Sequence, residues 1–128
     1  MPTRTVVRTE QAPAAIGPYS QGICSGNLIF TAGQIPIDPA TGKLIEGSFE
    51  DQVHRVLRNL EGVLTAAGSS LNQVVKFTVF VTDLGNFSLL NQVFAQYFQE
   101  DPPARSAVQV SALPLGAEVE IEAVAVVD

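Results

Sequence analysis

An arginine at the start of a strand-like segment is the first candidate for chemistry in this sequence. The segment PPARSAVQV, residues 102–110, places Arg105 after two prolines and before an alternating apolar pattern. The prolines restrict the backbone, and the planar guanidinium can hold a carboxylate through two parallel hydrogen bonds. A surface ion pair with Glu100 or Asp101 is the commoner fate of such an arginine. Its position alone therefore leaves a carboxylate-binding role and a surface ion pair both open.

Carboxylates near the end of the chain form the second candidate group. In the segment EVEIEAVAV, Glu118, Glu120 and Glu122 alternate with apolar residues, which places the three carboxylates on one face of a strand. This face becomes apolar towards Val124 and Val126, so a glutamate near the transition can be half-buried and can exchange a proton. A solvated acidic face is the alternative interpretation.

Tyr19 is the remaining candidate, a phenol in a loop over residues 11–22 that is rich in Gly, Pro and small residues. It can be the wall of a pocket or a packed aromatic side chain, and spacing does not decide between them. His54 is the one histidine and Cys24 the one cysteine, and the sequence has no phosphate-binding or dinucleotide-binding glycine motif. We therefore expect no metal site and no Ser/His/Asp triad within one chain. We also expect His54 to lie on a solvated helix face.

The elements that position these residues can be predicted from hydrophobic periodicity. Strands are expected at 4–8, 28–32, 73–83, 105–110 and 118–127, with residues 23–24 paired to the second strand across a Ser-Gly-Asn turn, and 38–43 as a turn. Helices are expected at 48–67 and 87–98, with Ser48 and Asn86 as N-caps and Gly68 ending the first helix. In the third strand, Val75, Phe77, Val79 and Val81 are expected on one face, and in the second helix Leu90, Val93, Phe94 and Tyr97 are expected on the inner face.

The order of these elements predicts the fold class. Strands, helix, strand, helix and strands favour an α+β domain, with one mixed sheet and two helices packed on one of its faces. At 128 residues the chain is expected to form a single domain, residues 1–128. The second face of such a sheet needs a cover.

Composition limits the partners of this domain. Thirteen acidic and seven basic residues give a net charge of −6 without any Lys/Arg cluster, which argues against nucleic acid and against a polybasic membrane contact. No apolar segment is long enough for a signal peptide or a membrane span, and a lone cysteine fits a reducing compartment, so a cytoplasmic location is expected. Charged residues make up 16% of the chain, whereas about 25% is typical of soluble domains. Burial against other copies explains this shortfall, and a polar but uncharged surface is the alternative.

Five ordered segments make the sequence similar to the Rid family of reactive-intermediate deaminases, and to its RidA branch in particular. They are APAAIGPYSQG, AGQIP, VVKFTVFVTDL, PARS and VEIEAVAV, and the similarity runs over residues 12–127. The resemblance implies a chorismate-mutase-like α+β fold and a homotrimer whose sheets form an inner barrel, with active sites in clefts between subunits. It also implies hydrolysis of 2-iminobutanoate and 2-iminopropanoate to the 2-oxo acid and ammonia, without a metal or organic cofactor.

The same resemblance implies roles for single residues. Arg105 would hold the substrate carboxylate, Ala107 would add its backbone N–H, and Glu120 would position the attacking water. Tyr19 and Gly33 would line the pocket. Two positions depart from the family pattern: cysteine is usual where Ala107 stands, and serine often precedes the glycine at position 33, where this chain has alanine. The first departure puts thiol-based regulation in doubt, and the second removes one possible hydroxyl contact.

Three other functions have to be weighed against a deaminase. A non-catalytic trimer that binds 2-oxo acids as a sensor or regulatory partner would need Arg105 but not Glu120. An endoribonuclease role, also attached to this family, is disfavoured by a pI near 4.6 and by the absence of a histidine pair. A chorismate mutase would need several cationic groups for its dicarboxylate substrate, and Arg105 alone is well placed.

Overall fold

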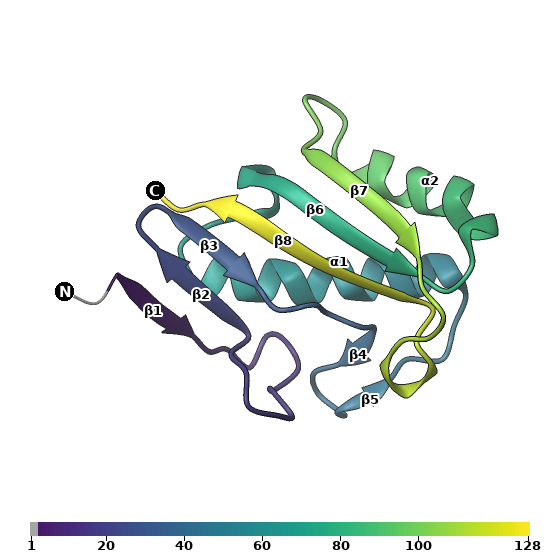
Figure 1. Cartoon of the computed structure of the whole chain (residues 1–128), viewed down its shortest axis with the longest axis horizontal. Coiled ribbons are helices and arrows are strands. Elements are labelled where there is room, and N and C mark those ends of the chain that lie inside the picture. The colour runs from purple at the N-terminus through teal and green to yellow at the C-terminus, as the bar shows by residue number, and fades with distance from the viewer. Residues whose placement is uncertain (1–2) are drawn as a thin grey trace.

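The computed structural model of the protein describes residues 3–128, which form a twisted sheet with helices on one face (Figure 1). The six strands of this sheet are β1 (Arg4–Val7), β2 (Gly22–Ser25), β3 (Leu28–Thr31), β6 (Val74–Val81), β7 (Ala104–Gln109) and β8 (Val119–Val126). Their order is β1-β2-β3-β8-β6-β7. β6 and β7 run parallel, whereas β1–β2, β2–β3, β3–β8 and β6–β8 are antiparallel. The predicted mixed sheet, including the β2–β3 hairpin, is confirmed.

The helix α1 (Phe49–Ala66) begins and ends where the sequence predicts. The Ser48 hydroxyl accepts a hydrogen bond from the Asp51 N–H at 3.1 Å, and the Asp51 carboxylate accepts one from the Ser48 N–H at 3.2 Å. Such a reciprocal pair satisfies two donors that a helix start leaves free. Gly68, just beyond the C-cap, has φ +84°, the left-handed conformation that glycine adopts without strain.

The helix α2 (Phe87–Tyr97) begins differently from the prediction. Asn86 makes no side-chain capping bond, because it belongs to a short 3₁₀ turn, η2 (Leu84–Asn86), that leads into the helix. Asp83 caps that turn by accepting a hydrogen bond from the Gly85 N–H at 2.7 Å. The capping residue therefore lies three positions earlier than expected.

The core lies between the two helices and the sheet. Its largest fully buried side chains come from α1, α2 and the strands β3, β6 and β8: Val53, Val56, Leu57, Leu60, Val63, Leu64, Leu90, Ile29, Phe77, Val79, Val81 and Ile121. Removing each such side chain from water contributes about 1.5–3 kcal/mol to folding. On α2 the predicted inner face is buried at Leu90, Val93 and Phe94, while Tyr97 is half-buried at its margin. This packing holds β6, β7 and β8 rigidly under the helices.

One residue of β6 does not lie where simple alternation places it. The pairing of β6 with β8 shifts register between Val74 and Lys76, so that Val74 is buried while Val75 is 46% exposed. A bulge of this kind adds one residue to a strand and changes the face that its side chain occupies. The prediction that Val75 shares a buried face with Phe77 is therefore wrong.

The turn predicted at 38–43 is the tip of a small hairpin. Its strands are β4 (Ile37–Asp38) and β5 (Lys43–Leu44). The fully buried Asn59 of α1 donates to the carbonyl oxygens of Ile35 and Ile37, at 3.3 and 2.9 Å. These bonds fix the segment that follows β3 against the helix.

The sheet face that points away from the helices carries exposed apolar side chains. Val6, Phe30 and Val108 lie on β1, β3 and β7, and they are 39%, 43% and 44% exposed. Together they spread from one edge of the sheet to the other, which identifies this face as the one that needs a cover. Within residues 3–128, no helix has the length and apolar character needed to cross a bilayer.

Candidate functional site

Arg105 lies at the edge of the sheet and points towards α2. It is paired with Phe77 of β6, whose side chain is fully buried under the helices, so the two side chains share that face. One Arg105 guanidinium nitrogen donates to Asn91 Oδ1 at 2.7 Å. The guanidinium carbon lies 5.0 Å from the ring centre of Phe94 and 5.4 Å from that of Phe87. An amide and two aromatic faces therefore orient the cation.

The ion pair that competes with a binding role for Arg105 is not formed. Among residues 3–128, no carboxylate lies within salt-bridge distance of Arg105, neither Glu100 nor Asp101; the ion pair found there joins Arg58 and Glu61. Burial without an anion lowers the pKa of Arg105 below its usual value. The guanidinium borders a cavity of about 450 Å³ that Phe98, Pro102 and Pro103 also line. The structure thus places a cation without a counterion beside open space.

The backbone of Ala107 can supply a second donor at the same edge. The Val110 N–H, just beyond β7, donates to the Val81 carbonyl of β6 at 2.8 Å. Successive residues of a strand present their N–H groups to alternate edges, so the N–H groups of Arg105 and Ala107 point away from β6. β7 is an edge strand, so this direction is the unpaired side of the sheet. The Ala107 side chain packs against the core instead.

Glu120 lies on the opposite face of the sheet. It is paired with Phe80 of β6, in the set of side chains that alternates with the buried residues of β8. Partial burial, and secondarily the neighbouring Glu122, raise the pKa of Glu120 above its usual range. No hydrogen bond within residues 3–128 stabilises its charged form. A carboxylate in this environment is a better proton acceptor than an ordinary surface glutamate.

Gly33 is the residue against which the Glu120 carboxyl lies. A Cβ at position 33 would collide with Oε2 of Glu120 and would lie 2.9 Å from its Cδ. The backbone here is held by Gln34, which exchanges hydrogen bonds of 2.8 and 3.1 Å with Ile121. Glycine at position 33 therefore allows the carboxyl group to lie directly against the main chain.

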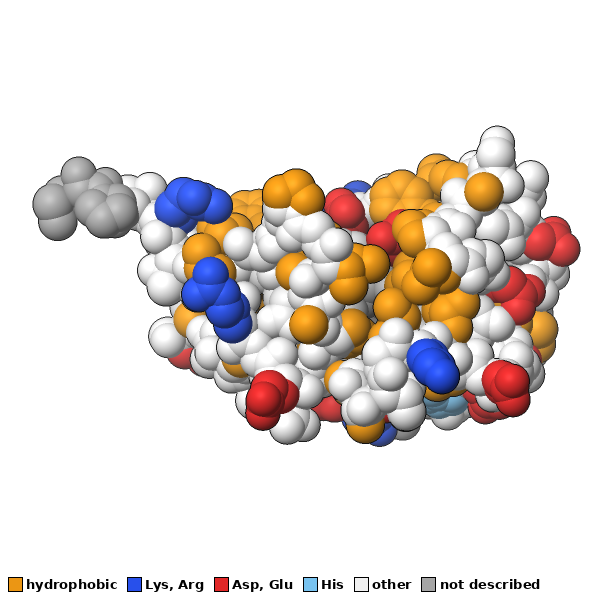
Figure 2. All heavy atoms as spheres, turned by 90° about the horizontal axis from the view of Figure 1, so that it is seen from below, with side chains coloured by type: hydrophobic (Ala, Val, Ile, Leu, Met, Phe, Trp, Pro, Cys, Tyr) orange, Lys and Arg blue, Asp and Glu red, His pale blue; other side chains and the backbone are white. Residues whose placement is uncertain are grey.

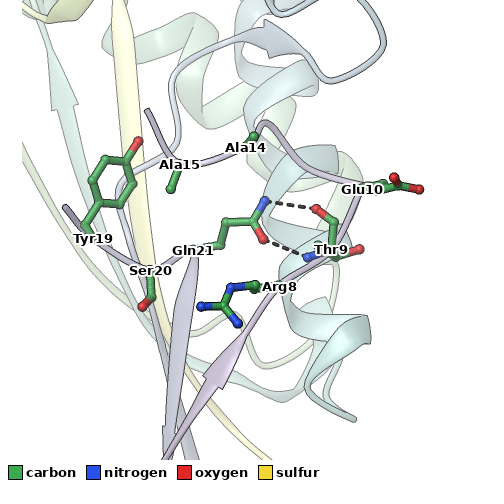
Figure 3. A pocket seen from close by; sticks show the side chains of 8 residues that line it. All are labelled: Arg8, Thr9, Glu10, Ala14, Ala15, Tyr19, Ser20 and Gln21. Carbon is green, nitrogen blue, oxygen red and sulfur yellow. Dashed lines mark hydrogen bonds between the residues drawn. The ribbon is translucent and has the colours of Figure 1, made fainter. Parts of the chain in front are cut away.

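Tyr19 projects from the loop that follows β1. The loop is anchored by the buried Gln21, whose amide accepts from the Thr9 N–H at 2.8 Å and donates to the Thr9 carbonyl oxygen (Figure 3). The same amide also donates to the carbonyl oxygens of Ala12 and Pro13. Tyr19 itself is 51% exposed, and its hydroxyl accepts only a long bond, 3.4 Å, from the Ile16 N–H. Tyr19 is thus the wall of a cavity, not a packed core residue.

Tyr19, Gly33 and Glu120 line one cavity of about 390 Å³. The rest of its wall is mainly apolar and is formed by Pro13, Ala14, Ile16, Ala32, Ile35, Ile37 and Pro114, together with Gln34. Figure 2 shows the molecule from the lower side of Figure 1, where the β1–β2 loop and β4–β5 lie. Hydrophobic side chains gather there on both sides of a hollow, and acidic side chains lie beside it. The structure therefore brings together three of the five predicted site residues.

The other two, Arg105 and Ala107, belong to a different surface of the same chain. Arg105 is on the helix side of the sheet and borders its own cavity, and Glu120 is on the uncovered side. The sheet itself separates the two charged groups. A site that uses both must combine residues from two copies of the chain.

Two contacts were not foreseen from the sequence. Asn91 holds Arg105 by a hydrogen bond. The sequence could have indicated this role of Asn91, because its helical spacing from Phe87 and Phe94 places all three side chains on one face of α2. His54 was expected to be solvated but is half-buried beside Tyr97, and its Nδ1 lies 2.7 Å from the Tyr97 hydroxyl. Among residues 3–128, no three His, Cys, Asp or Glu side chains cluster closely enough to hold a metal ion.

Comparison with known proteins gives one consistent result. The family model described as endoribonuclease L-PSP matches residues 9–127. A RutC family protein of Pyrococcus horikoshii is 52% identical over 122 residues, which are 95% of this chain and 97% of the relative. The 2-iminobutanoate/2-iminopropanoate deaminase of Bos taurus is 47% identical over 123 residues, which are 96% and 90% of the two chains.

Solved structures agree with this result. A Yersinia pestis protein of the conserved Rid family, of unknown function, superposes with a TM-score of 0.94 at 49% identity, covering 97% of this chain and 99% of that one. Escherichia coli TdcF with bound serine gives a TM-score of 0.92 at 43% identity, with coverage of 97% and 99%. The sequence, the fold and these relatives together show that the chain belongs to the Rid family of proteins.

Proposed function

We propose that the protein is a 2-iminobutanoate/2-iminopropanoate deaminase, which hydrolyses reactive enamine/imine intermediates to 2-oxo acids and ammonia. The observation that carries the proposal is an oriented guanidinium without a counterion, together with a half-buried glutamate of raised pKa in a second cavity. The deaminase name of the Bos taurus relative supports this assignment.

Arg105 holds the substrate carboxylate. Its guanidinium is charged, oriented by Asn91 and free of any carboxylate among residues 3–128. The outward N–H of Ala107 adds a neutral donor at the same strand edge, and this donor does not depend on the side chain at position 107. The serine bound to Escherichia coli TdcF supports the capture of a small amino-acid-like carboxylate.

Glu120 acts as the base for water. Water attacks the iminium carbon and forms a C–O bond, while its proton moves to the Glu120 carboxylate. The same proton then passes to the nitrogen, the C–N bond breaks and ammonia leaves. The Glu120 carboxylate takes the hydroxyl proton, which forms the carbonyl group of the 2-oxo acid, and then releases this proton to solvent. General acid–base assistance of this kind contributes roughly 10²–10⁴-fold, and fixed orientation of the substrate contributes further.

The complete site requires a second copy of the chain. Arg105 and Glu120 lie on opposite faces of one sheet, and the uncovered face carries the apolar side chains of Val6, Phe30 and Val108. A homotrimer that packs these faces inward buries the apolar surface and brings Arg105 of one subunit to Glu120 of the next. Light scattering that gave the mass of one 13.6 kDa chain at micromolar concentration would contradict this assembly.

Subunit mixing tests the shared site directly. Arg105→Ala and Glu120→Ala subunits, each with only a small residual activity alone, are unfolded together and refolded as a mixture. In a closed ring of three, every mixed trimer contains one interface with both native residues, so equal mixing restores about a quarter of the wild-type activity. If both residues act within one chain, the mixture keeps only that residual activity.

Imine diversion tests the activity itself and separates it from a non-catalytic sensor. A threonine dehydratase releases 2-aminocrotonate, which tautomerises to 2-iminobutanoate, and semicarbazide traps that imine. The protein is expected to lower semicarbazone formation in proportion to its concentration, also in EDTA. Glu120→Gln should keep 2-oxobutanoate binding but lose the diversion. A wild type that binds 2-oxobutanoate without lowering semicarbazone formation would favour the sensor.

A further inference from the structure

The cavity drawn in Figure 3 lies beside the proposed site and contains a cation that the site does not use. Its volume is about 410 Å³, and Arg8, Thr9, Ala14, Tyr19, Ser20 and Gln21 are among its lining residues. Ala14 and Tyr19 also line the cavity of Glu120 and Gly33. The two cavities are therefore neighbours, with the Tyr19 side chain as a shared wall.

Arg8 is the group in this second cavity that can bind an anion. No ion pair with a carboxylate of residues 3–128 neutralises it. Glu10 also lines the cavity, but its carboxylate points away from the Arg8 guanidinium (Figure 3). The amide of Gln21 is already committed to backbone atoms of the loop, whereas Ser20 adds a hydroxyl to the lining of the same cavity.

We propose that Arg8 binds a second carboxylate, so that the site accepts 2-imino acids whose side chain ends in an anionic group, such as 2-iminoglutarate. This inference rests on the proposed function. The first carboxylate of such a substrate is held by Arg105 of one subunit. The side chain then passes Tyr19 of the next subunit, and its terminal carboxylate meets Arg8, whose planar guanidinium suits a carboxylate.

The weak anchoring of the Tyr19 side chain supports this path. Tyr19 is half exposed, and its hydroxyl makes only the long 3.4 Å contact with the Ile16 N–H. The ring can therefore turn without breaking a strong hydrogen bond. The floor under it is rigid, because Gln21 binds four backbone groups of the loop.

Binding of two product-like ligands tests the inference. 2-Oxoglutarate carries the second carboxylate, and 5-methyl-2-oxohexanoate has the same shape with two methyl groups in place of its oxygens. Calorimetry on the assembled protein should show tighter binding of 2-oxoglutarate. Arg8→Gln should weaken the binding of 2-oxoglutarate about tenfold, the loss expected for one charge-assisted hydrogen bond. The ratio of the two dissociation constants should fall by the same factor.

Arg4→Gln is the matched control, because Arg4 is an exposed arginine of the same strand segment that does not line the cavity. It should leave the preference unchanged. Equal weakening of both ligands in Arg8→Gln, the same weakening in Arg4→Gln, or no preference in the wild type would each overturn the inference. Calorimetry needs no turnover, so a protein that prefers 2-oxoglutarate through Arg8 without hydrolysing imines would contradict the proposed deaminase alone.

Discussion

Replacement of Gly33 by alanine tests whether the position of the Glu120 carboxyl limits catalysis. The new Cβ would lie 2.9 Å from Cδ of Glu120, whereas ordinary contact begins at 3.4 Å. The carboxyl group must therefore retreat by about 0.5 Å or more, and a misplacement of about 1 Å costs on the order of 10²-fold in rate. We expect kcat/KM for 2-iminobutanoate, measured by semicarbazide competition, to fall between about 10-fold and 100-fold.

The fold should tolerate this change. The atoms that the Cβ meets belong to the far end of a half-exposed side chain, and the backbone of Gly33 is not in the left-handed region. Alanine also reduces the entropy of the unfolded chain, worth about 0.4–1 kcal/mol. The melting temperature should therefore change little, and a loss of activity cannot be assigned to unfolding.

Two further variants make the reasoning refutable. Gly17→Ala is the matched control, because its Cβ would meet only the Tyr19 ring, at an ordinary 3.6 Å. In a Glu120→Ala background, Gly33→Ala should cost nothing more, since the group that it displaces is gone. Near-native activity of folded Gly33→Ala, or a full further loss in the Glu120→Ala background, would show that Gly33 does not act through Glu120.

The remaining predictions concern the charged groups and position 107. Arg105→Lys should lower kcat/KM, because an ammonium group cannot make the two-pronged contact with the substrate carboxylate. The lost binding free energy should be on the order of 1.5–3 kcal/mol, and near-native rates would exclude the carboxylate clamp. Glu120 must be ionised to accept a proton, so activity should fall as the pH drops through its pKa, which is raised by burial and secondarily by Glu122. Glu122→Gln should therefore lower the pH at which activity is lost. Glu118→Gln should leave this pH unchanged, because the Glu118 carboxylate accepts a hydrogen bond elsewhere. Equal shifts of this pH in both variants would contradict the assignment. Ala107→Cys should change kcat/KM little, because only the backbone N–H faces the free edge; a large gain would give the thiol a chemical role.

Local rules predicted most of the fold. Ser48, the apolar stripe of α1 and the alternation in β8 each specify their element within a few neighbouring residues, and these predictions are confirmed. The errors arose where a distant pairing decides the outcome. Val75 is exposed because β8 imposes a bulge on β6, and Asn86 is not a cap because Asp83 starts the turn earlier.

The site was less predictable than the fold. Local spacing around Arg105 could not decide between a surface ion pair and a free cation, because the answer depends on Asn91 and the aromatic rings of α2. The parity of β8 placed Glu120 on the correct face, but its contact with Gly33 depends on how the segment after β3 lies along β8. The family resemblance supplied the residue roles that spacing could not, and those roles stay predictions.

The way in which Gln21 holds its loop has an evolutionary consequence. Each of its hydrogen bonds goes to a main-chain N–H or carbonyl group, which residues of almost any type provide. Side chains along the loop, including Ala14 and Ile16 at the cavity wall, can therefore be exchanged without loss of the anchor. Duplicated copies of such a gene could diverge in the ligands they accept through mutations in this loop, while Glu120 and the sheet stay as they are.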